Sequence, residues 1–388
     1  MLPPRVLFVH AGAELYGADR ILLELAAGLL ERGHGLHVVL PGPGPLHHEL
    51  QQLGVPTQQC NLGVLRRRYF NPRGLLNRVC RVLGAVWHLR QLVRAKRIDI
   101  VHSNTTAVIA GAVAAWLAGV PHVWHVHEIT TRPRWLARGM AAFVGLMSQR
   151  AVFVSEATRQ HMVSLNPRVQ TRAVVIHNGI DPARALAGCP GVLRAELGWA
   201  ADAVVVGMIG RINWWKGQGQ LLECAMRLSS SKPGLRFLMV GGTFEGDNRV
   251  RDELLAGITA QRLEAVVSVL DFRPDVGNVL ADIDIFVLPS TEPDPFPTVV
   301  LEAMAAARPV VAFRHGGVCE MVADGESGLL CAPGSTEEMT AAISRLAASP
   351  ALRQRMGQSG RERLQRLFTR EAFIERFVRL YRELTPGA

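Results

Sequence analysis

Short apolar runs alternate with helical patterns from near the start of the chain to about residue 181. Each run is four to seven residues long, rich in aliphatic or aromatic residues, and bounded by polar or turn residues, which is typical of buried strands. The predicted strands are Arg5–His10, Gly35–Leu40, Ile98–Asn104, His122–His127, Ala151–Val154 and Ala173–Ile176. Helical spacing lies between them, as in Ile21–Arg32 and Ala157–Ser164. This alternation predicts a parallel sheet covered by helices.

The pattern breaks at Asp181–Ala201, a Pro-, Gly- and Ala-rich segment that reads as a domain linker with one short helix. A second alternation follows, with predicted strands at Val204–Ile209, Arg236–Gly241, Val266–Leu270, Ile283–Leu288, Pro309–Phe313 and Gly328–Cys331. Three helical patterns end the chain, at Thr336–Ala347, Ala351–Leu367 and Arg370–Leu384. We therefore predict an α/β protein with two Rossmann-like domains, 1–181 and 182–369, that face each other across a cleft.

The stretch Asp284–Phe313 reads as strand, loop, helix and strand. Its helix begins near Pro297, which suits a first helical turn, and continues from Thr298 to Ala305. A helix N-terminus at the carboxyl end of a parallel strand is a common place for phosphate. Glu302 lies within this otherwise apolar helix. It is either a surface residue of an amphipathic helix or a buried acceptor for hydroxyl groups.

Composition narrows the class of protein. The 388 residues contain six scattered cysteines without the spacing of a zinc site, so we expect free thiols in a reducing cytoplasm. The segment after Met1 lacks the features of a signal peptide. The longest apolar segment, near Ala107–Val120, is too short to span a membrane and predicts a buried helix.

The formal charge of +10 is concentrated in one window. No Asp or Glu occurs from Leu50 to Ile98, whereas ten cations do: Arg66, Arg67, Arg68, Arg73, Arg78, Arg81, Arg90, Arg94, Lys96 and Arg97. Apolar residues, among them Leu83 and Trp87, are interleaved at helical spacing. This pattern fits a helix on an anionic membrane surface, and equally a solvated basic face over a core. Nucleic acid is a weaker alternative, because no nucleic-acid motif accompanies the charge.

Candidate chemistry lies at the ends of the predicted strands. Arg211 and Lys216 follow the first strand of the second half. A guanidinium fork and an ammonium at this place would suit a diphosphate. The alternative is a pair of ordinary surface cations. Gly316 and Gly317 follow a later strand and would permit close approach of a phosphate. Gly12 and Gly17 follow the first strand of the chain, but not in the spacing of a dinucleotide fingerprint.

These motifs together resemble the family 4 glycosyltransferases, which are retaining enzymes with the GT-B architecture. The resemblance rests on Gly210-Arg211…Lys216-Gly217, Asp294…Glu302-Ala303-Met304-Ala305, Pro309-Val310-Val311-Ala312, Gly316-Gly317…Glu320 and Asp324-Gly325…Gly328-Leu329-Leu330. Weaker matches lie at Gly12…Gly17-Ala18-Asp19-Arg20, His127 and Asn178-Gly179-Ile180-Asp181. It implies that the last helix, about 370–388, crosses back to the first, acceptor-binding domain, and that 182–369 binds a nucleotide sugar.

The resemblance also implies roles for individual residues. Arg211 and Lys216 would hold the donor diphosphate, and Glu302 would accept hydrogen bonds from the ribose hydroxyls. Asp294 would contact the transferred sugar at a position where the family usually has Glu, and Asp is one methylene shorter. The backbone at Phe296, Pro297 and Thr298 would lie near the sugar and the phosphate. Gly12 and Gly17 would let the first domain approach the diphosphate closely. His127 would lie near the sugar on the acceptor side, and Asn178 would contact substrate. An ordinary core or surface histidine is the alternative for His127.

The implied reaction is transfer of a sugar from a UDP- or GDP-sugar to a lipid-linked or polysaccharide acceptor, at the inner face of a membrane. We expect no metal and no cofactor, because protein cations would stabilise the leaving diphosphate. That expectation assumes a chain without an Asp-x-Asp motif. Two alternatives stay open at this stage. One is a nucleotide-sugar epimerase of the same fold, and the other is a non-catalytic basic module that binds lipid or nucleic acid.

Overall fold

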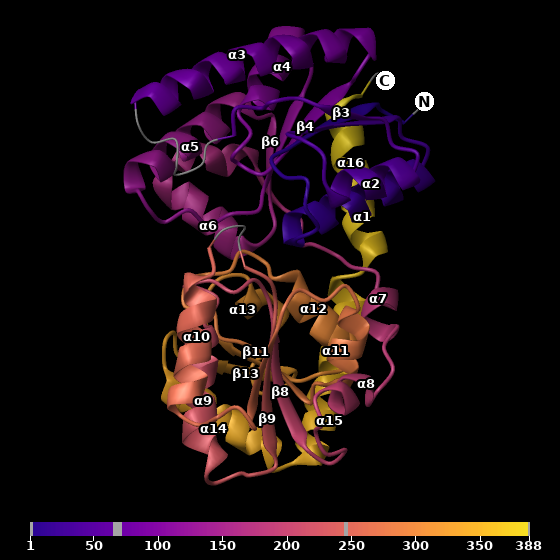
Figure 1. Ribbon diagram of the computed structural model, residues 1–388. Helices are drawn as coiled ribbons and strands as arrows, with labels where there is room; N and C mark the ends of the chain where they lie inside the picture. Colours follow the sequence, from indigo (N-terminus) through magenta and orange to yellow (C-terminus); the bar gives the residue numbers. More distant parts are fainter. Residues whose placement is uncertain (1–2, 65–71, 244–246, 387–388) are drawn as a thin grey trace. The chain divides into compact units, whose positions relative to one another are not determined.

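A computed structural model describes residues 3–64, 72–243 and 247–386, with side chains from residue 77 in the helix that begins at Pro72. The chain divides into two compact units (Figure 1). The first unit contains Met1–Gly179 and Arg370–Ala388, and the second contains Ile180–Thr369. The sequence places this boundary at residues 181 and 182.

The first unit is built on a parallel seven-stranded sheet, in the order β3-β2-β1-β4-β5-β6-β7. Its strands are β1 (Val6–His10), β2 (Leu36–Leu40), β3 (Thr57–Gln59), β4 (Ile100–Asn104), β5 (His122–Val126), β6 (Arg150–Phe153) and β7 (Ala173–Val175). Its helices are α1 (Gly17–Glu31), α2 (Pro45–Gln52), α3 (Pro72–Ala95), α4 (Ala110–Ala118), α5 (Arg134–Met147), α6 (Glu156–Leu165), the 3₁₀ helix η2 (Pro167–Arg172) and α16 (Arg370–Leu384). The alternation predicted from the sequence is confirmed, whereas β3 and α2 lie in a segment without a predicted element.

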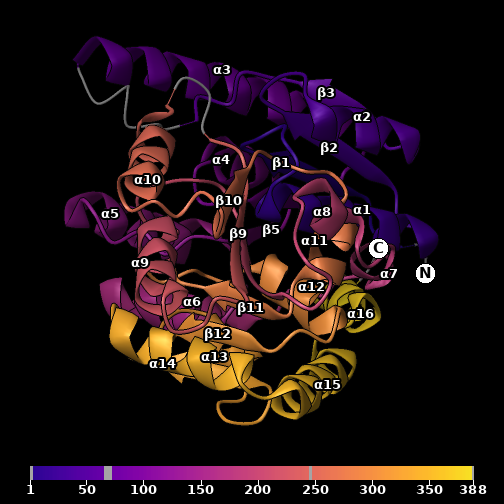
Figure 2. The same ribbon diagram turned by 60° about the horizontal axis from the view of Figure 1, so that its bottom comes forward.

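Helices cover both faces of this sheet because successive strand residues point to opposite sides. Val6 and Phe8 of β1 pack in a cluster with α1 and α16, and Leu7 and Val9 pack in a cluster with α3 and α4. The last helix contributes Phe373, Phe377 and Tyr381, all at most 2% exposed, to the first of these clusters. Figures 1 and 2 show α16 beside α1. The expectation that the C-terminal helix joins the N-terminal domain is therefore confirmed.

The second unit has a parallel six-stranded sheet in the order β10-β9-β8-β11-β12-β13. Its strands are β8 (Val204–Ile209), β9 (Leu235–Val240), β10 (Val267–Leu270), β11 (Ile285–Leu288), β12 (Val310–Phe313) and β13 (Gly328–Cys331). Its helices are α7 (Ala183–Leu186), α8 (Val192–Glu196), α9 (Gln218–Ser229), α10 (Arg249–Ala260), α11 (Val276–Asp282), α12 (Thr298–Ala305), α13 (Val318–Met321), α14 (Thr336–Ala347) and α15 (Pro350–Leu367). Every strand predicted for this half is present within one or two residues.

The segment expected to be a linker is an anchored part of the second unit. It contains two short helices, α7 and α8, rather than one, and both contact α11. The Asp282 carboxylate accepts hydrogen bonds from the backbone N–H groups of Gly191, at 2.6 Å, and Leu193, at 2.8 Å. A side chain on Gly188 would collide with the carbonyl of Gly277. The segment therefore packs as closely as the core helices.

Strand order defines one switch point in each sheet, between β1 and β4 in the first and between β8 and β11 in the second. Chain connections leave such a pair of strands in opposite directions, so a crevice opens at their carboxyl ends, and ligands of open α/β sheets bind there. Gly12, Lys216 and Asp294 follow β1, β8 and β11 at these switch points, whereas His127, Asn178 and Gly316 follow the other strands β5, β7 and β12. The candidate site is therefore described separately for each unit.

Candidate functional site

In the second unit, the loops that follow β8 and β11 lie against each other. Gly217 has a φ of 86°, and a Cβ on it would lie 1.8 Å from the carbonyl oxygen of Pro289. The Thr291 N–H donates to the carbonyl of Trp215 at 2.7 Å. Only glycine permits both the left-handed backbone and the close approach at position 217. This contact brings the cationic loop of β8 beside the acidic loop of β11.

Lys216 and Asp294 form an ion pair across these two loops. Lys216 Nζ lies 2.5 Å from Asp294 Oδ2, and 4.3 Å from the centre of the Trp215 ring. Asn213 holds the turn, since its side-chain oxygen accepts the N–H groups of Trp215, at 3.2 Å, and Lys216, at 3.0 Å. The residues expected to bind phosphate and sugar are thus already in contact.

Arg211 lies at the start of the same turn and is half-buried. Its carbonyl accepts a hydrogen bond from Gln218 Nε2 at 3.1 Å, which ties the turn to the beginning of α9. The structure therefore places Arg211 and Lys216 in one short loop before the N-terminus of a twelve-residue helix. Two cations and free helical N–H groups at a strand end are suited to a diphosphate.

Gly316 and Gly317 pack against the loop that contains Asp294. Gly316 has a φ of 68°, and a Cβ on it would lie 2.4 Å from the Asp294 carbonyl oxygen. The Gly317 N–H donates to that same oxygen at 2.8 Å. The sequence ascribes these glycines to close approach of a phosphate. In the structure, the close approach at each Cα is made by backbone of residues 294–296 of the chain itself.

Phe296, Pro297 and Thr298 connect this loop to α12. Phe296 is 5% exposed, and its ring lies 5.6 Å from that of Phe368. Pro297 is the N-cap of α12 rather than its first helical residue, and its carbonyl accepts the Val300 N–H at 3.0 Å. Thr298 begins the helix and is half-buried. The N-terminus of α12 therefore opens next to Asp294, as the sequence predicts.

Glu302 lies one turn into α12, enclosed but still partly accessible to solvent. Burial raises the pKa of its carboxyl group to about 7, against a weaker opposing effect of the Arg184 cation. No hydrogen bond or ion pair from the described part of the chain reaches this carboxylate. The sequence allows two interpretations of Glu302, a surface residue or a buried acceptor for hydroxyl groups, and this enclosure disagrees with a fully exposed surface residue. A carboxylate held without a partner is prepared to accept hydrogen bonds from a ligand.

In the first unit, Gly12 lies where β1 leads into α1. A Cβ on Gly12 would lie 2.8 Å from Asp19 Oδ1, so glycine here makes room for a carboxylate of the chain. Gly17 is the first residue of α1, and Asp19 Oδ2 accepts the Tyr16 N–H at 2.9 Å. Neither glycine has a positive φ. Asn178 follows β7 and is 2% exposed, and its side-chain oxygen has no partner within the described residues.

His127 follows β5 at the same edge of the first sheet. Its Nε2 lies 2.9 Å from Asn104 Oδ1, and its backbone N–H donates to Glu128 Oε2 at 3.2 Å. Burial, and to a lesser extent the neighbouring His10, lower the pKa of His127 to about 3. The ring is therefore neutral near pH 7, and it can exchange hydrogen bonds with a ligand but is a poor proton donor there.

Four residues at this edge were not singled out as site residues in the sequence: His10, Asp19, Asn104 and Glu128. His10 and Asn104 end β1 and β4, Asp19 lies in the first turn of α1, and Glu128 follows β5 by two residues. The predicted strands did end in polar clusters. Asp19 also belonged to a weak family match. Burial raises the pKa of the Glu128 carboxyl group, which accepts the N–H of Thr106 at 3.1 Å. Strand ends thus gave the signal, but spacing could not reveal which of these side chains touch.

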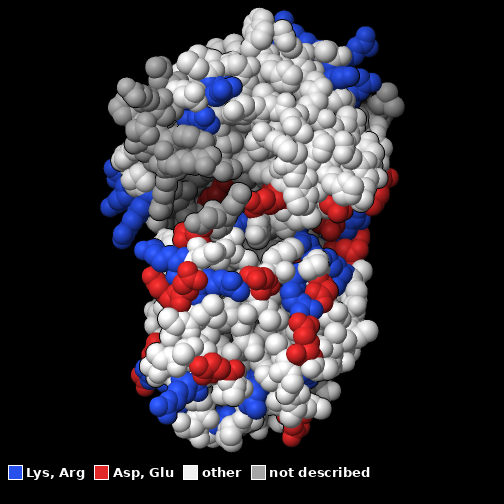
Figure 3. All heavy atoms as spheres, viewed as in Figure 1, with Lys and Arg blue, Asp and Glu red and all other residues white. Residues whose placement is uncertain are grey.

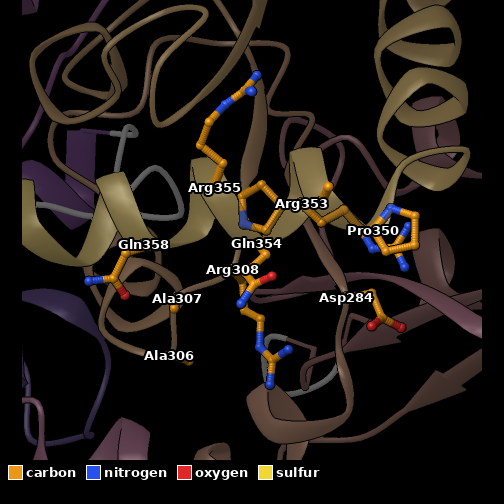
Figure 4. A pocket seen from close by; sticks show the side chains of 11 residues that line it. Asp284, Ala306, Ala307, Arg308, Pro350, Arg353, Gln354, Arg355 and Gln358 are labelled. Carbon is orange, nitrogen blue, oxygen red and sulfur yellow. The ribbon is translucent and has the colours of Figure 1, made fainter.

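An open groove of about 790 Å³ lies away from these loops. It is lined by residues that precede β11 and β12, such as Asp284 and Arg308, and by the start of α15. Parallel strands place this groove at the opposite edge of the sheet from Lys216 and Asp294. Figure 4 shows the guanidinium groups of Arg308 and Arg355 pointing in different directions. Arg308 and Arg355 therefore do not converge on one point in the groove, and the switch point remains the candidate site.

Asp282 and Asp284 have Asp-x-Asp spacing, so the assumption that the chain lacks this motif is wrong. Both carboxylates already have partners, since Asp282 accepts backbone N–H groups and Asp284 Oδ2 accepts from Arg194, at 2.8 Å, and from the Val205 N–H. They lie at the edge of the sheet opposite the candidate site. Among the described residues, no group of three or more His, Cys, Asp or Glu side chains is arranged to hold a metal ion. Within the same residues, no helix is both long and apolar enough to cross a membrane.

Comparison with known proteins relates both halves of the chain to the same enzymes. Residues 16–184 match the model described as Glycosyltransferase Family 4, and residues 192–363 match Glycosyl transferases group 1. The chain is 30% identical over 321 residues to alpha-maltose-1-phosphate synthase of Mycobacterium tuberculosis, covering 75% of this chain and 80% of that protein. It is 29% identical over 387 residues to D-inositol 3-phosphate glycosyltransferase of Saccharomonospora viridis, covering 93% and 81%.

Solved structures show the same architecture. HepE of Anabaena, determined in complex with UDP, has a TM-score of 0.82 and 25% identity, with 98% of this chain and 100% of that chain covered. HepE in complex with UDP and glucose has a TM-score of 0.83, also at 25% identity, with 97% and 99% covered. The glycosyltransferase WaaG has a TM-score of 0.72 at 16% identity, which supports the fold alone.

Proposed function

Because this chain belongs to the family 4 glycosyltransferases and has the GT-B fold, we propose that it is a retaining, metal-independent hexosyltransferase. Its donor is a UDP- or GDP-sugar, and its acceptor is a lipid-linked or polysaccharide glycan of the cell envelope or an exopolysaccharide. The observation that supports a sugar-diphosphate donor is the Lys216–Asp294 ion pair at the switch point of the second sheet. The pair consists of a cation of the kind that suits phosphate and a carboxylate of the kind that suits sugar hydroxyls, 2.5 Å apart.

The donor is bound by the loops after β8 and β11 together with α12. Arg211 and Lys216 bind the diphosphate, and the backbone of residues 296–298 and of Gly316 and Gly317 lines the position of the phosphate and sugar. Glu302 accepts hydrogen bonds from the two ribose hydroxyls, since an ionised carboxylate has two acceptor oxygens for a vicinal diol. Gly12, Gly17, His127 and Asn178 of the first unit contribute to binding of the diphosphate, the transferred sugar and the acceptor.

Charge explains how these residues accelerate transfer. Cleavage of the bond between the anomeric carbon and the diphosphate develops negative charge on the leaving group. The fixed cations Arg211 and Lys216 stabilise that charge more strongly in the transition state than in the bound donor. Asp294 keeps the Lys216 ammonium in place before the donor binds and then contacts a sugar hydroxyl. The acceptor oxygen attacks from the face that the leaving phosphate occupies, and the phosphate takes up its proton.

Calorimetry with UDP-glucose tests the donor site. HepE has been crystallised with UDP and glucose, which makes this donor the first choice, and GDP-mannose is the second. Lys216→Ala and Glu302→Ala should each weaken donor binding by about tenfold or more, because each removes a charge-assisted hydrogen bond. Glu264→Ala, an exposed change in the same unit, is the control. Unchanged binding in both site variants would refute the assignment.

Product analysis tests the reaction itself. NMR of the glycoside should show the anomeric configuration of the donor, and an inverted product would contradict retention. Activity should also survive incubation with EDTA. Incubation of the enzyme with donor alone distinguishes an epimerase, because an isomerised nucleotide sugar would then accumulate without an acceptor.

We propose that the first unit, which binds the acceptor, works at the cytoplasmic face of an anionic membrane. The outer face of α3 exposes Val79, Leu83 and Trp87, four residues apart, at 55%, 64% and 58%. Arg90 stacks on Trp87, with the guanidinium carbon 5.5 Å from the ring centre, and exposed cations such as Arg81 and Arg94 lie on the same helix. In the unit of Figure 3 that contains α3, groups of Lys and Arg atoms lie at the α3 end and also at one side of the unit away from α3, and acidic atoms lie toward the other end. Four cations of the basic region 66–97, at positions 66–68 and 73, lie outside the described side chains.

An apolar stripe edged by cations fits the interface of an anionic bilayer. Flotation of the protein with phosphatidylglycerol vesicles should weaken as the salt concentration rises. The double variant Leu83→Ser/Trp87→Ser should float more weakly than the wild type. Trp135→Ser removes a tryptophan of similar exposure, 67% against 58% for Trp87, from α5 and is the matched control. Equal flotation of all three proteins would leave α3 as a solvated face over the core.

A further inference from the structure

A continuous line of polar side chains crosses three neighbouring strand ends in the first unit. Asp19 Oδ1 lies 2.6 Å from His10 Nε2, and His10 Nδ1 lies 3.0 Å from Asn104 Nδ2. Asn104 Oδ1 lies 2.9 Å from His127 Nε2. His10 and Asn104 are paired in register across β1 and β4, and both are at most 1% exposed. The line therefore connects the first turn of α1 to the ring of His127 by direct contacts between its members.

The orientation of the Asn104 amide follows from its neighbours. Its Nδ2 lies 3.3 Å from the carbonyl oxygen of Ala18, which can only accept a hydrogen bond. The amide nitrogen must therefore face Ala18 and His10, and the amide oxygen must face His127. His10 is held at both ring nitrogens. Its Nε2 lies 2.6 Å from the Asp19 carboxylate, and its Nδ1 lies 3.0 Å from the amide nitrogen of Asn104 and 3.2 Å from the backbone carbonyl oxygen of Asn104.

We propose that Asp19, His10 and Asn104 are positioning residues that hold His127 with its proton on Nε2, so that Nδ1 accepts a hydrogen bond from a hydroxyl of the transferred sugar. The amide oxygen of Asn104 can only accept, so Nε2 of His127 must donate. Among the described residues, none forms a hydrogen bond with Nδ1 of His127. The contact with sugar rests on the function proposed above, whereas the proton position does not.

The ring of His127 is also held in place by packing. His125 lies two residues earlier on the same face of the sheet, and the two ring centres are 4.0 Å apart. His125 packs in turn on Phe377 of α16, at 5.1 Å, and is fully buried. Thr105, next to Asn104, has a φ of 89°, which is unusual for a β-branched residue. Strained backbone of this kind occurs where the surroundings fix a functional geometry.

Nitrogen NMR of the full-length protein labelled in histidine tests the proton position. Long-range proton–nitrogen spectra distinguish a protonated ring nitrogen from one with a free lone pair, and comparison with His127→Phe assigns the signals of His127. In the wild type, Nε2 should carry the proton and Nδ1 should not. Asn104→Ala should convert this state into a mixture of the two tautomers.

The neighbouring residue Ser103 provides a matched control. Its hydroxyl bonds to Nε2 of His122 at 2.9 Å on the other face of the sheet, so Ser103→Ala should leave the His127 signals unchanged. A His127 with its proton on Nδ1, or with the same single tautomer in Asn104→Ala, would overturn the proposal.

The sugar contact is tested by comparing the affinities of UDP-glucose and UDP. Asn104→Ala should weaken binding of UDP-glucose by about five- to tenfold, as expected for one hydrogen bond, and leave UDP unchanged. A structural defect would weaken both ligands equally. A changed tautomer with an unchanged ratio of affinities would refute the contact with sugar. Failure of the wild type to bind any of UDP-glucose, UDP, GDP-mannose and GDP would contradict the proposed function and leave the proton position to the NMR result.

Discussion

At the scale of single residues, Glu302 illustrates the cost of keeping a carboxylate ready for a ligand. Burial raises its pKa from 4.5 to about 7. The folded protein therefore binds a proton more tightly than the unfolded chain does, and the free energy of unfolding falls as the pH rises from about 4.5 to 7. The shift of about 2.5 units corresponds to an upper limit of about 3 kcal/mol.

Glu302→Gln should remove this pH-dependent loss of stability. In urea titrations without ligand, we expect the variant to be about 1–3 kcal/mol more stable than the wild type at pH 8 and nearly equal to it at pH 5. Glu264→Gln, at an exposed position, should match the wild type at both pH values. A constant difference across the pH range would contradict the raised pKa.

The Lys216–Asp294 pair belongs to the same scale and predicts coupled losses. Lys216→Met should destabilise the second unit by about 1–3 kcal/mol, because it leaves the nearly buried Asp294 without its cation, and Asp294→Asn should destabilise it similarly. The double variant should lose less than the sum, since the two changes remove one interaction. A double-mutant cycle measured by denaturant unfolding gives this coupling, and strictly additive losses would show that the pair does not contribute.

The positions of these residues could be predicted from the sequence, but their partners could not. The carboxyl ends of parallel strands lie along the same edge of a sheet, so the sequence predicts that Arg211, Lys216 and Asp294 lie near one another. That Lys216 pairs with Asp294, or that Gly12 makes room for Asp19, depends on how two loops fold against each other. Periodicity contains no information on such contacts between loops.

At the scale of secondary structure, the strands of both sheets were predictable because they are buried on both faces and therefore continuously apolar. The strand β3 was missed since its sequence, Thr57–Gln59, is polar and lies at an edge of the sheet. The helices α7 and α8 were read as a linker because they are short and rich in Pro, Gly and Ala. Their order comes from tertiary contacts with α11, which local propensity does not report.

Packing of α16 on α1 predicts an unusual effect of a glycine substitution. Gly28 lies within α1, and a Cβ there would lie 1.9 Å from Cδ1 of Ile374. Gly28→Ala should therefore lower the free energy of unfolding by about 1–3 kcal/mol, although alanine is the better helix former. Combining it with Ile374→Ala should recover part of the loss attributable to the collision.

Gly139 in α5 is the matched control, because a Cβ there would meet no atom within 4 Å. Gly139→Ala should raise stability by about 0.5–1 kcal/mol. Thermal or urea unfolding of the four proteins provides the comparison. Similar gains in both alanine variants would show that α16 does not constrain α1 at this position.

At the scale of the whole molecule, the two units differ in how the chain builds them. The second unit is one continuous segment, Ile180–Thr369, whereas the first needs Arg370–Ala388 from the other end of the chain. Phe373, Phe377 and Tyr381 are buried in the same cluster as Val6 and Phe8. Tyr381 also bonds through its hydroxyl to Nδ1 of His102 at 2.6 Å. A fragment without α16 would expose this cluster to water.

We therefore expect residues 180–369 to fold alone and to bind UDP or GDP, with a cooperative thermal transition that the bound nucleotide shifts upward. Residues 1–179 alone should lack a cooperative transition, because loss of several buried aromatic side chains exceeds the net stability of a domain of this size. Addition of a peptide with the sequence of residues 370–388 should restore the transition, and a peptide with Phe373, Phe377 and Tyr381 replaced by serine should not. A cooperative transition in 1–179 without the peptide would show that α16 is dispensable for the first unit.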